Sequence, residues 1–472
     1  MSEYDLIVIG SGPGGEKAAV KARFFGYSVA LIEKEPKLGG AGSQTGTMPS
    51  KTLKETAIYL SGIRDKGVFG VERKLERKAD IEEFYYRKNR VIEESDEEVN
   101  TNMESHGVDL YYGTASFLDA HRIHVEGEDP TTLTGRFILL ATGSYPNHPP
   151  GIPFDGKHVH DSDTILQLDR IPQSLVVIGA GVIGCEYASI FALMNQQVTL
   201  INSRESFLQF IDPEITAELR RAMESNGVHF LMGNSVEKVQ IDENPPRMED
   251  SVKARLSNGQ EIGAEMFLYA AGRNGCIHQL ELDKVGIDTG PRETIAVNEQ
   301  YQTNLPNVYA VGDVIGFPAL ASTSMDQGRV AVAHMFQLND LVHIQKQFSF
   351  GIYTIPEVAS IGKSEADCQK EGIACITGRA YVSKMPRGRI MGFTKGILKI
   401  ICERETQKVI GVHVVAAIAT EIIHFGMVAV EDEMKLTRLI GMVYNMPTLH
   451  ELYKYAAYDA LTKVEKDAEL KR

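Results

Sequence analysis

The sequence has 472 residues, which at ~150 residues per domain suggests about three domains, each long enough to bury a core. Apolar residues make up 43% of the chain and charged residues 24%, a composition that excludes extended disorder, collagen and coiled-coil architectures. The formal net charge of −14 repels polyphosphates at long range, and it therefore disfavours nucleic acid as a partner.

The cysteines and the apolar segments indicate a cytoplasmic protein. Five cysteines are scattered along the chain without a Cys-x-x-Cys pair or the spacing of a zinc site, so we expect reduced thiols and no metal. The most apolar long segment, residues 409–430, is interrupted by His413, Glu421 and His424. Because a membrane span needs ~20 residues nearly free of charge, we expect no membrane partner.

The N-terminal segment contains a strand, a glycine-rich turn and a helix. Residues 4–9 form a short apolar run typical of a buried strand, and residues 10–15 read GSGPGG. A helical pattern follows up to Phe25, and residues 28–32 predict a second strand that ends at Glu33. These elements form one β-α-β unit.

The unit recurs about 170 residues later in the chain. Residues 174–178 predict a strand, residues 179–184 read GAGVIG, and a helical pattern runs to about Met194. The next strand, residues 197–201, ends at Asn202. The repeat indicates that the chain carries two nucleotide-binding units.

Both turns have the spacing Gly-x-Gly-x-x-Gly between a strand and a helix. Glycine at these positions lets the backbone approach a pyrophosphate, and the helix N-terminus stabilises its charge. The alternative is a tight turn without a ligand, which two copies in the same context disfavour. We therefore expect two dinucleotide sites.

The residue that ends the second strand differs between the two units. Glu33 can accept hydrogen bonds from both hydroxyls of an adenosine ribose. Asn202 does not repel a 2′-phosphate, and Arg204 could pair with one; the alternative is that Arg204 is a solvated loop residue. The second site is therefore expected to accept NADP and also NAD.

Two shorter motifs close the units, and the pattern of strands and helices changes after them. Residues 138–143 (ILLATG) and 267–272 (FLYAAG) are apolar strands that end at glycine, as expected where a backbone passes close to a cofactor. From about residue 348 strands alternate with helices, with strands expected at 396–402 and 409–415. The expected fold class is α/β, with two Rossmann-like dinucleotide-binding domains and a C-terminal α+β domain.

Three further motifs accompany the two turns. The first is residues 39–51, which contain Gly-Gly and end in Pro-Ser-Lys; the second is Gln302-Thr303; and the third is NVYAVGD at 307–313. With the turns, they resemble the pyridine nucleotide–disulfide oxidoreductase family over essentially the whole chain. The resemblance implies FAD on the first unit, a nicotinamide nucleotide (NAD or NADP) on the second, and a homodimer. It implies an FAD-binding domain at 1–150 and 274–345, an NAD(P)-binding domain at 151–273 and a dimerisation domain at 346–472.

The resemblance also implies roles for individual residues. Asp313 matches the acid that hydrogen-bonds the flavin ribityl chain, Lys51 matches the lysine beside the reactive flavin edge, and Glu186 matches the glutamate that pairs with it. A purely structural Lys–Glu pair is the alternative, which the flavin context disfavours. The implied FAD-binding residues are Gly10, Gly12, Gly14, Gly15, Glu33, Lys34, Gly40, Lys51, Ala115, Thr142, Gly143, Gly312 and Asp313. The implied NAD(P)-binding residues are Gly179, Gly181, Gly184, Asn202, Arg204 and Gly272.

The sequence departs from the family at its redox residues. Disulfide reductases carry a Cys-x-x-x-x-Cys pair before the lysine, and here those positions are Gly42 and Thr47. Their proton-transfer histidine is replaced by Met446 here, and His450 lies nearby in the sequence as an alternative proton-transfer residue. Glu451 still fills the position of the family's glutamate and stays a candidate catalytic residue. Without a thiolate and an imidazole there is neither a nucleophile nor an acid–base partner for a disulfide substrate. Reduction of lipoamide, glutathione, trypanothione or mercuric ion is disfavoured.

One branch of the family, the flavin-dependent pyridine nucleotide transhydrogenases, also lacks the full dithiol and the histidine. Residues 46–51 (GTMPSK), 179–191 (GAGVIGCEYASIF) and 445–448 (Asn-x-Pro-Thr) resemble its motifs, although that branch usually keeps a cysteine at position 42. The resemblance implies reversible hydride transfer from NADPH to flavin and then to NAD at one site, with ping-pong kinetics. Lys51 would stabilise negative charge on reduced flavin. The alternatives are a diaphorase or quinone reductase of the same fold, and a non-catalytic flavoprotein.

Overall fold

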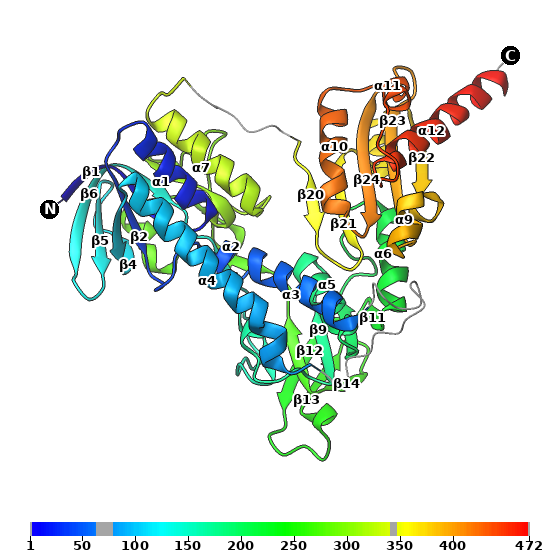
Figure 1. The fold of residues 1–472 in the computed structure, drawn as a ribbon. Coiled ribbons are helices and arrows are strands. Elements are labelled where there is room, and N and C mark those ends of the chain that lie inside the picture. Colours follow the sequence, from blue (N-terminus) through cyan, green and yellow to red (C-terminus); the bar gives the residue numbers. More distant parts are fainter. Residues whose placement is uncertain (1, 63–78, 340–346, 471–472) are drawn as a thin grey trace.

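The computed structural model describes residues 2–62, 79–339 and 347–470. Figure 1 shows three lobes, each built around a β-sheet. The first lobe contains β1 and the helices α1 and α7, the second contains β9 and α5, and the third contains β20–β24 with α10 and α12. The expected α/β class with two dinucleotide-binding units and a C-terminal α+β unit is confirmed.

The first sheet has the strand order β3-β2-β1-β6-β5-β4, with β19 beside β6. Its strands are β1 (Ser2–Ile9), β2 (Val29–Glu33), β3 (Asp109–Tyr112), β4 (Thr114–Phe117), β5 (Arg122–Glu126), β6 (Thr131–Leu140) and β19 (Val308–Ala310). The strand β6 pairs with antiparallel β5 through its first residues and with parallel β19 through its last. The chain leaves β1 for β2 on one side and returns to β6 on the other, so the carboxyl ends of β1 and β6 border the crevice where α/β sheets bind ligands.

The helices around this sheet have recognisable start and stop signals. Helix α1 (Pro13–Phe24) begins at a proline and packs against α7 (Ala321–Met335). Helix α4 (Ile81–His106) begins with a capping box, in which Asp80 accepts from the backbone N–H of Glu83 at 2.9 Å and Glu83 accepts from that of Asp80 at 3.1 Å. After the short helix α2 (Gly40–Ser43), helix α3 (Thr47–Ser61) packs against α4 and against α5 of the second lobe.

The second sheet is parallel, with the order β11-β10-β9-β15-β8. Its strands are β8 (Val159–His160), β9 (Ser174–Ile178), β10 (Gln197–Asn202), β11 (Val228–Met232) and β15 (Met266–Tyr269). Helices α5 (Val182–Leu193) and α6 (Pro213–Ser225) connect them, and β12 (Val236–Ile241), β13 (Val252–Leu256) and β14 (Glu261–Ala264) form a separate antiparallel sheet. The strands β7 (Ser144–Pro146) and β16 (Arg273–Gly275) pair where the chain passes between the two lobes.

The third sheet is antiparallel, with the order β20-β21-β24-β23-β22. Its strands are β20 (Phe350–Ile352), β21 (Glu357–Gly362), β22 (Cys375–Tyr381), β23 (Ile397–Glu403) and β24 (Val409–Ala416). The helices of this lobe are α8 (Glu365–Glu371), α9 (Pro386–Met391), α10 (Ala419–Glu431), α11 (Leu436–Gly441) and α12 (Glu451–Leu470). Helix α10 packs on β21 and β24 and α12 packs on β22 and β23, which buries one continuous apolar core.

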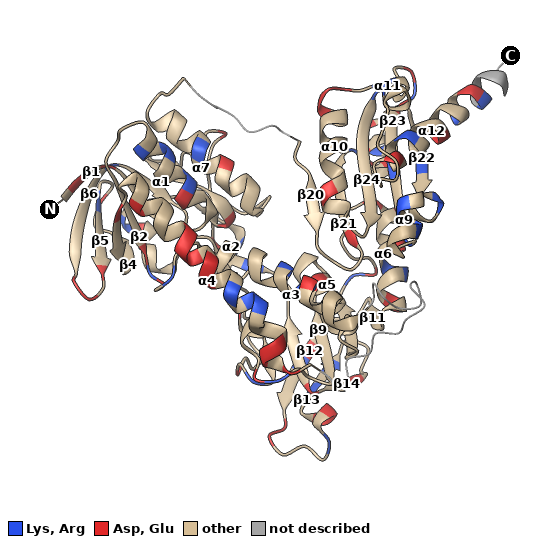
Figure 2. Cartoon of the chain, in the orientation of Figure 1, with Lys and Arg blue, Asp and Glu red and all other residues tan. Residues whose placement is uncertain are grey.

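Charged residues lie mainly on helices and connecting loops, whereas the strands are largely uncharged (Figure 2). This distribution follows from burial, because β2 and β9 are buried along their whole length and β1 along its second half. Lys399 of β23 is an exception at 2% exposed, and its ammonium is paired with carboxylates of Asp212, Glu214 and Glu365. Across the described part of the chain, no helix combines the length and apolar character that crossing a membrane requires.

Candidate nucleotide and redox site

The first glycine-rich turn follows β1, and two of its glycines are required by packing. Gly10 has φ +101°, and a β-carbon there would lie 2.4 Å from the carbonyl oxygen of Ala141. A β-carbon on Gly15 would lie 1.9 Å from the carbonyl oxygen of Gly10. By contrast, nothing lies within 4 Å of a β-carbon on Gly12, which is the N-cap of α1 and has no side-chain cap. The turn therefore leaves open space in front of unpaired N–H groups, as a phosphate site requires.

The carboxyl ends of β6 and β19 lie beside this turn. Thr142 follows β6, and its hydroxyl oxygen is buried with no hydrogen-bond partner among the described residues. Asp313 follows β19 and accepts a hydrogen bond from the Ser144 hydroxyl at 2.8 Å. Buried polar atoms are normally paired, so the orphaned hydroxyl of Thr142 fits a site whose polar partner is a bound group. The residues present thus fit the dinucleotide that the sequence predicts.

The remaining FAD candidates lie around the same turn. Glu33 ends β2 and is 8% exposed; one carboxylate oxygen accepts from the backbone N–H (2.9 Å) and hydroxyl (2.7 Å) of Ser11. The other oxygen accepts from the backbone N–H groups of Lys34 and Glu35, so ribose hydroxyls would share this carboxylate with Ser11.

The other candidates pack nearby. A β-carbon on Gly40 would approach Gly12, and one on Gly14 or Gly312 would approach Ser324. Ala115 is buried in a cluster with Ile9 and Ile32, and Gly143 has φ +72°.

The second turn repeats this geometry at the end of β9. Gly179 has φ +103°, and a β-carbon there would lie 2.9 Å from the backbone of Ala270. A β-carbon on Gly184 would lie 1.9 Å from the carbonyl oxygen of Gly179, whereas nothing lies within 4 Å of one on Gly181. The same distribution of filled and open space in both turns indicates the same kind of ligand.

Asn202 and Arg204 lie at the end of β10, as the sequence predicts. The Asn202 amide donates to the carbonyl oxygens of Arg204 (3.0 Å) and Ser206 (3.1 Å) and accepts from the backbone N–H of Ala180 at 3.3 Å. Asn202 therefore holds the loop and ties it to the glycine turn. The guanidinium of Arg204 is exposed and donates to Gln209 at 2.8 Å, so it can exchange this contact for an anion.

Sequence reasoning did not identify Arg292, which lies against Gly272 after the strand that closes the second unit. A β-carbon on Gly272, at the carboxyl end of β15, would lie 3.6 Å from a guanidinium nitrogen of Arg292. Arg292 and Glu293 have φ of 56° and 59°, and non-glycine residues in this region are uncommon and cluster at functional sites. No spacing in the sequence marks this contact, because it joins a loop to a strand end 20 residues earlier.

Lys51 and Glu186 meet between the two turns. Lys51 lies in α3 and Glu186 in α5, 135 residues apart, and the ammonium donates to the carboxylate at 2.7 Å. The carboxylate is 5% exposed and the lysine side chain 27% exposed. The pairing implied by the family resemblance is thus present in the structure, with the ammonium at the accessible side of a buried carboxylate.

The positions of the missing thiols are filled by the chain. A β-carbon on Gly42 would lie 2.8 Å from Cγ of Pro13, so the backbone at position 42 has no room for a larger side chain without a shift. Thr47 begins α3. Cys185, beside Glu186, is fully buried, and burial raises the pKa of its thiol well above the usual range, which keeps it protonated.

The C-terminal candidates lie apart from the Lys51 pair within one chain. Met446 is 73% exposed. Glu451 begins α12 and has a buried carboxylate oxygen without a partner among the described residues. Burial lowers the pKa of His450, whose ring stacks on Tyr453. No hydrogen bond or ion pair in the described ranges joins Glu451 to Lys51.

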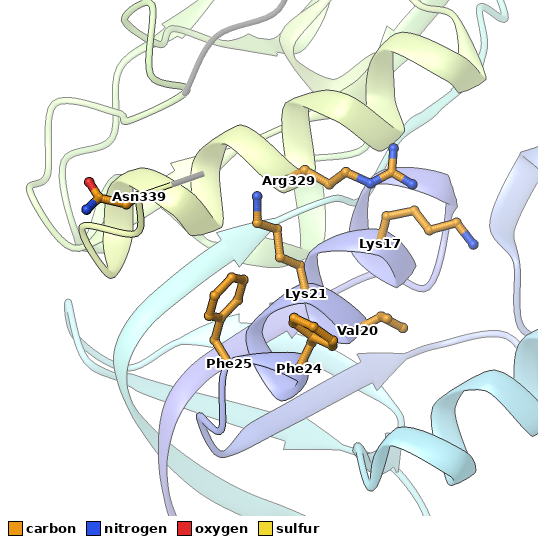
Figure 3. Close-up of a pocket in the computed structure, with 7 residues that line it drawn as sticks. All are labelled: Lys17, Val20, Lys21, Phe24, Phe25, Arg329 and Asn339. Carbon is orange, nitrogen blue, oxygen red and sulfur yellow. The ribbon is translucent and has the colours of Figure 1, made fainter. Parts of the chain in front are cut away.

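A further cavity lies away from both turns. It has a volume of about 520 Å³ and opens on the outer face of the first lobe between α1 and α7 (Figure 3). It is lined by Lys17, Val20, Lys21, Phe24, Phe25, Arg329 and Asn339. Lys17 is paired with Glu16 at 2.6 Å and Arg329 with Asp326 at 2.5 Å. Two of the cations that line the cavity are therefore already paired with carboxylates.

Comparison with known proteins identifies relatives over the whole chain. The family described as "Pyridine nucleotide-disulphide oxidoreductase" matches residues 4–328, and its dimerisation domain matches residues 349–457. Proteins named "Soluble pyridine nucleotide transhydrogenase" are 39% identical in Mycobacterium bovis and 36% identical in Pectobacterium atrosepticum, each over 98% of both chains.

Solved structures have the same fold. LpdA from Mycobacterium tuberculosis superposes with a TM-score of 0.88 at 24% identity, over 97% of this chain and 99% of that one. The HOCl-induced flavoprotein disulfide reductase RclA from Escherichia coli gives a TM-score of 0.86 at 25% identity, over 96% and 99% of the two chains.

Proposed function

Because this chain belongs to the pyridine nucleotide-disulphide oxidoreductase family, we propose that it is a flavin-dependent transhydrogenase, which transfers hydride reversibly between NADPH and NAD. Transhydrogenases align with it from end to end. The proposal is supported by two glycine-rich turns that each leave open space at one glycine, together with the absence of thiols at positions 42 and 47, where Pro13 lies against Gly42.

The residues around the first turn would hold FAD, which when bound supplies a hydride acceptor and donor. The N-terminus of α1, with the open space at Gly12, would hold the pyrophosphate. Glu33 would hold the ribose, while Asp313 and the orphaned Thr142 hydroxyl would bind polar atoms of the cofactor. Lys51, held by Glu186, places a positive charge where negative charge develops.

NADPH and NAD bind in turn at the second site as substrates. The N-terminus of α5 faces the pyrophosphate at Gly181. Arg204 pairs with the 2′-phosphate of NADPH, and neutral Asn202, in place of an acid, leaves the pocket open to both nucleotides. Since the reaction needs no protein nucleophile, positioning and electrostatics suffice for catalysis.

The three lobes support the domain assignment that the sequence implies. Residues 1–150 and 274–345 form the FAD-binding domain, residues 151–273 the NAD(P)-binding domain and residues 346–472 the dimerisation domain of a homodimer. The pairing of β7 with β16 supports the first boundary, because the two connections run side by side there. We assign the protein to the cytoplasm, which is supported by five free cysteines.

The experiment that tests the function mixes the holoenzyme with NADPH and the NAD analogue thio-NAD. Rapid appearance of reduced thio-NAD supports transhydrogenation. Electron transfer only to a quinone or dye would make the protein a diaphorase, and absence of flavin bleaching with either nucleotide would make it a non-catalytic flavoprotein.

A further inference from the structure

Tyr353 contacts both members of the Lys51–Glu186 pair from the third lobe. It follows β20 directly, and its backbone N–H donates to Glu186 Oε1 at 2.8 Å. The other oxygen, Oε2, accepts from Lys51 at 2.7 Å. The two carboxylate oxygens of Glu186 thus have different partners, one on the first lobe and one on the third.

The ring of Tyr353 lies against two lysines of the same helix. The Lys51 ammonium is 4.9 Å and the Lys54 ammonium 5.5 Å from the ring centroid. Residues three apart share a helix face, so α3 presents both cations to one aromatic ring. Both distances are within the range of cation–π attraction.

A second lysine–carboxylate pair holds Lys54 in place. Lys54 is 4% exposed and pairs with Glu357 of β21. Glu357 also accepts from the backbone N–H (3.0 Å) and hydroxyl (2.7 Å) of Thr420, which lies in α10. Each pair is electrically neutral. The Lys51–Glu186 pair joins α3 to α5, and the Lys54–Glu357 pair joins α3 to β21.

We propose that Tyr353 is a positioning residue for the Lys51 ammonium, acting through its ring face and through its N–H on Glu186, while the Lys54 ammonium of the Lys54–Glu357 pair contacts the same ring. A lysine ammonium is a strongly hydrated charge on a flexible stem, and Lys51 is 27% exposed. Without the ring, the ammonium can rotate towards water and leave the position that Glu186 and Tyr353 define. The inference rests on the proposed function only in placing Lys51 beside the flavin.

The ring face, and not the hydroxyl, carries this role. Burial raises the pKa of Tyr353, so the side chain is neutral and no tyrosinate charge is involved. Tyr353→Phe keeps the aromatic face and the backbone N–H, whereas Tyr353→Leu keeps the N–H and an apolar side chain but removes the ring.

The test measures the midpoint potential of bound FAD and the kinetics of its reduction by NADPH in the holoenzymes. Tyr353→Leu is expected to make the potential more negative and to slow flavin reduction by about 2- to 30-fold, the range of a cation–π contact, with KM for NADPH within about twofold. Tyr353→Phe is expected to match the wild type. Tyr86→Leu, which removes an exposed tyrosine of α4, is the control.

A double-mutant cycle with Lys51→Met separates positioning from a general structural effect. If Tyr353 acts through Lys51, Tyr353→Leu shifts the potential in the wild type but adds little in the Lys51→Met background. An equal shift of the potential in both backgrounds, no shift in either, or a Tyr353→Phe variant as impaired as Tyr353→Leu would overturn the proposal.

Should Tyr353→Leu fail to retain FAD, Tyr353→Met keeps the apolar volume and enters the same cycle. The potential does not depend on the electron acceptor, so it tests this inference even if thio-NAD is not reduced.

Discussion

At the scale of single residues, the pair formed by Lys51 and Glu186 is the main electrostatic feature of the site. The carboxylate is buried and fixed by two donors, and the ammonium projects towards the accessible side. A fixed charge in a site of low dielectric stabilises developing charge without reorganisation at the moment of reaction. This arrangement links the position of Lys51 to the ease of hydride acceptance.

Lys51→Met removes that charge and retains the side-chain length. We expect FAD to remain bound, the flavin potential to become more negative and hydride acceptance to slow by about 10²-fold. Stopped-flow reduction by NADPH and a potentiometric titration measure both effects. Lys408→Met, at a surface pair with Glu433 in the third lobe, is the control. Unchanged rate and potential would show that Lys51 contributes packing only.

The thiol-free site predicts a spectroscopic result. Two-electron reduction should bleach the flavin without a long-wavelength band from a thiolate-to-flavin charge-transfer complex, because positions 42 and 47 are Gly and Thr and burial keeps Cys185 protonated. Absorbance spectra during anaerobic NADPH titration measure this, and Thr47→Cys provides the comparison with a restored thiol. A band in the wild type would point to Cys185 or another cysteine near the flavin.

Arg204, in the loop after β10, and Arg292, beside Gly272, predict different nucleotide effects. Loss of a charge-assisted bond worth roughly 1.5–3 kcal/mol in Arg204→Ala should weaken NADPH about 10- to 150-fold and NADH less than about threefold. Arg292→Ala should weaken both nucleotides alike, by about 3- to 30-fold, because Arg292 lies at Gly272 and not at the ribose loop. Flavin reduction rates against concentration for both donors measure these effects. Equal losses in Arg204→Ala would mean that Arg204 supports the loop.

At the scale of secondary-structure elements, each nucleotide turn combines a packed glycine with an open one. In the second turn, a β-carbon on Gly184 would collide with the carbonyl oxygen of Gly179, while one on Gly181 would enter empty space at the start of α5. Gly184 is therefore required by the packing of the fold, and Gly181 by the ligand. The two roles can therefore be separated by the same substitution.

Gly184→Ala and Gly181→Ala each add one methyl group. The methyl at 184 would lie 1.9 Å from the Gly179 carbonyl oxygen, so we expect a loss of about 1–3 kcal/mol from overpacking and a melting temperature lowered by several degrees. The methyl at 181 meets nothing within 4 Å, so the melting temperature should stay within about 2 °C while KM for both nucleotides rises. Thermal unfolding and steady-state kinetics measure the two effects. Comparable destabilisation by both would contradict this division of roles.

The nucleotide-binding elements could be predicted from the sequence because their signals are local. The predicted strand 174–178 is β9, and the predicted helix to about Met194 is α5 (Val182–Leu193). The pairing of β6 with both β5 and β19 could not be predicted, since β19 lies more than 160 residues later. The contacts of Tyr353 with α3 and of Arg292 with Gly272 were missed for the same reason: tertiary packing creates them, and no spacing in the chain encodes them.

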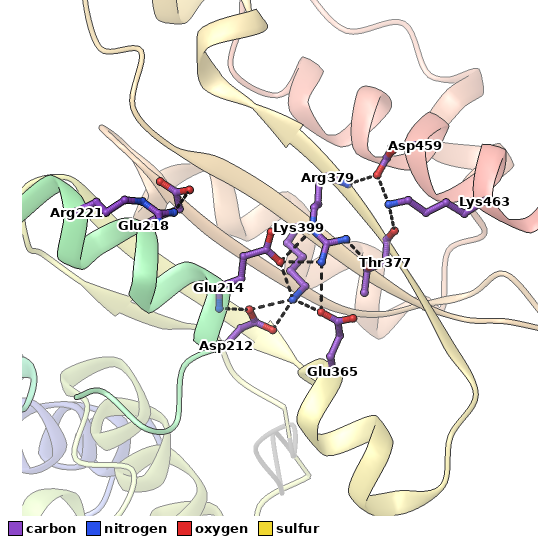
Figure 4. A network of polar contacts seen from close by, with 10 residues as sticks. All are labelled: Asp212, Glu214, Glu218, Arg221, Glu365, Thr377, Arg379, Lys399, Asp459 and Lys463. Atoms are coloured by element: carbon purple, nitrogen blue, oxygen red, sulfur yellow. Dashed lines mark hydrogen bonds and ion pairs between the residues drawn. The ribbon is translucent and has the colours of Figure 1, made fainter. Parts of the chain in front are cut away.

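At the scale of the whole molecule, a polar network joins the second and third lobes (Figure 4). Lys399 of β23 donates to both oxygens of Asp212 at 3.0 and 2.9 Å and lies 3.1 Å from Glu214, the second residue of α6. It also pairs with Glu365, and Arg379 of β22 binds Glu214 through two nitrogens at 2.7 and 2.8 Å. Removing one partner of a buried pair leaves an uncompensated charge, so this network couples the position of the nucleotide-binding lobe to that of the dimerisation lobe.

Glu214 makes the stability of this junction depend on pH. The hydrogen bond from Arg379 lowers the pKa of Glu214 below its usual 4.5. The carboxylate therefore stabilises the folded state fully above pH 4.5, and the contribution is lost as the pH falls through the lowered pKa. Glu214→Gln should cost about 1–2 kcal/mol at pH 7, lowering the melting temperature by a few degrees, and the difference from wild type should shrink below pH 4.5.

Glu218→Gln is the matched control, because Glu218 lies on the same helix and pairs with Arg221 at the surface (Figure 4). Thermal unfolding of the three proteins between pH 7 and pH 3 measures the effect, and a Glu214→Gln difference that stays constant with pH, or that Glu218→Gln reproduces, would show that the ion pair with Arg379 does not stabilise the junction.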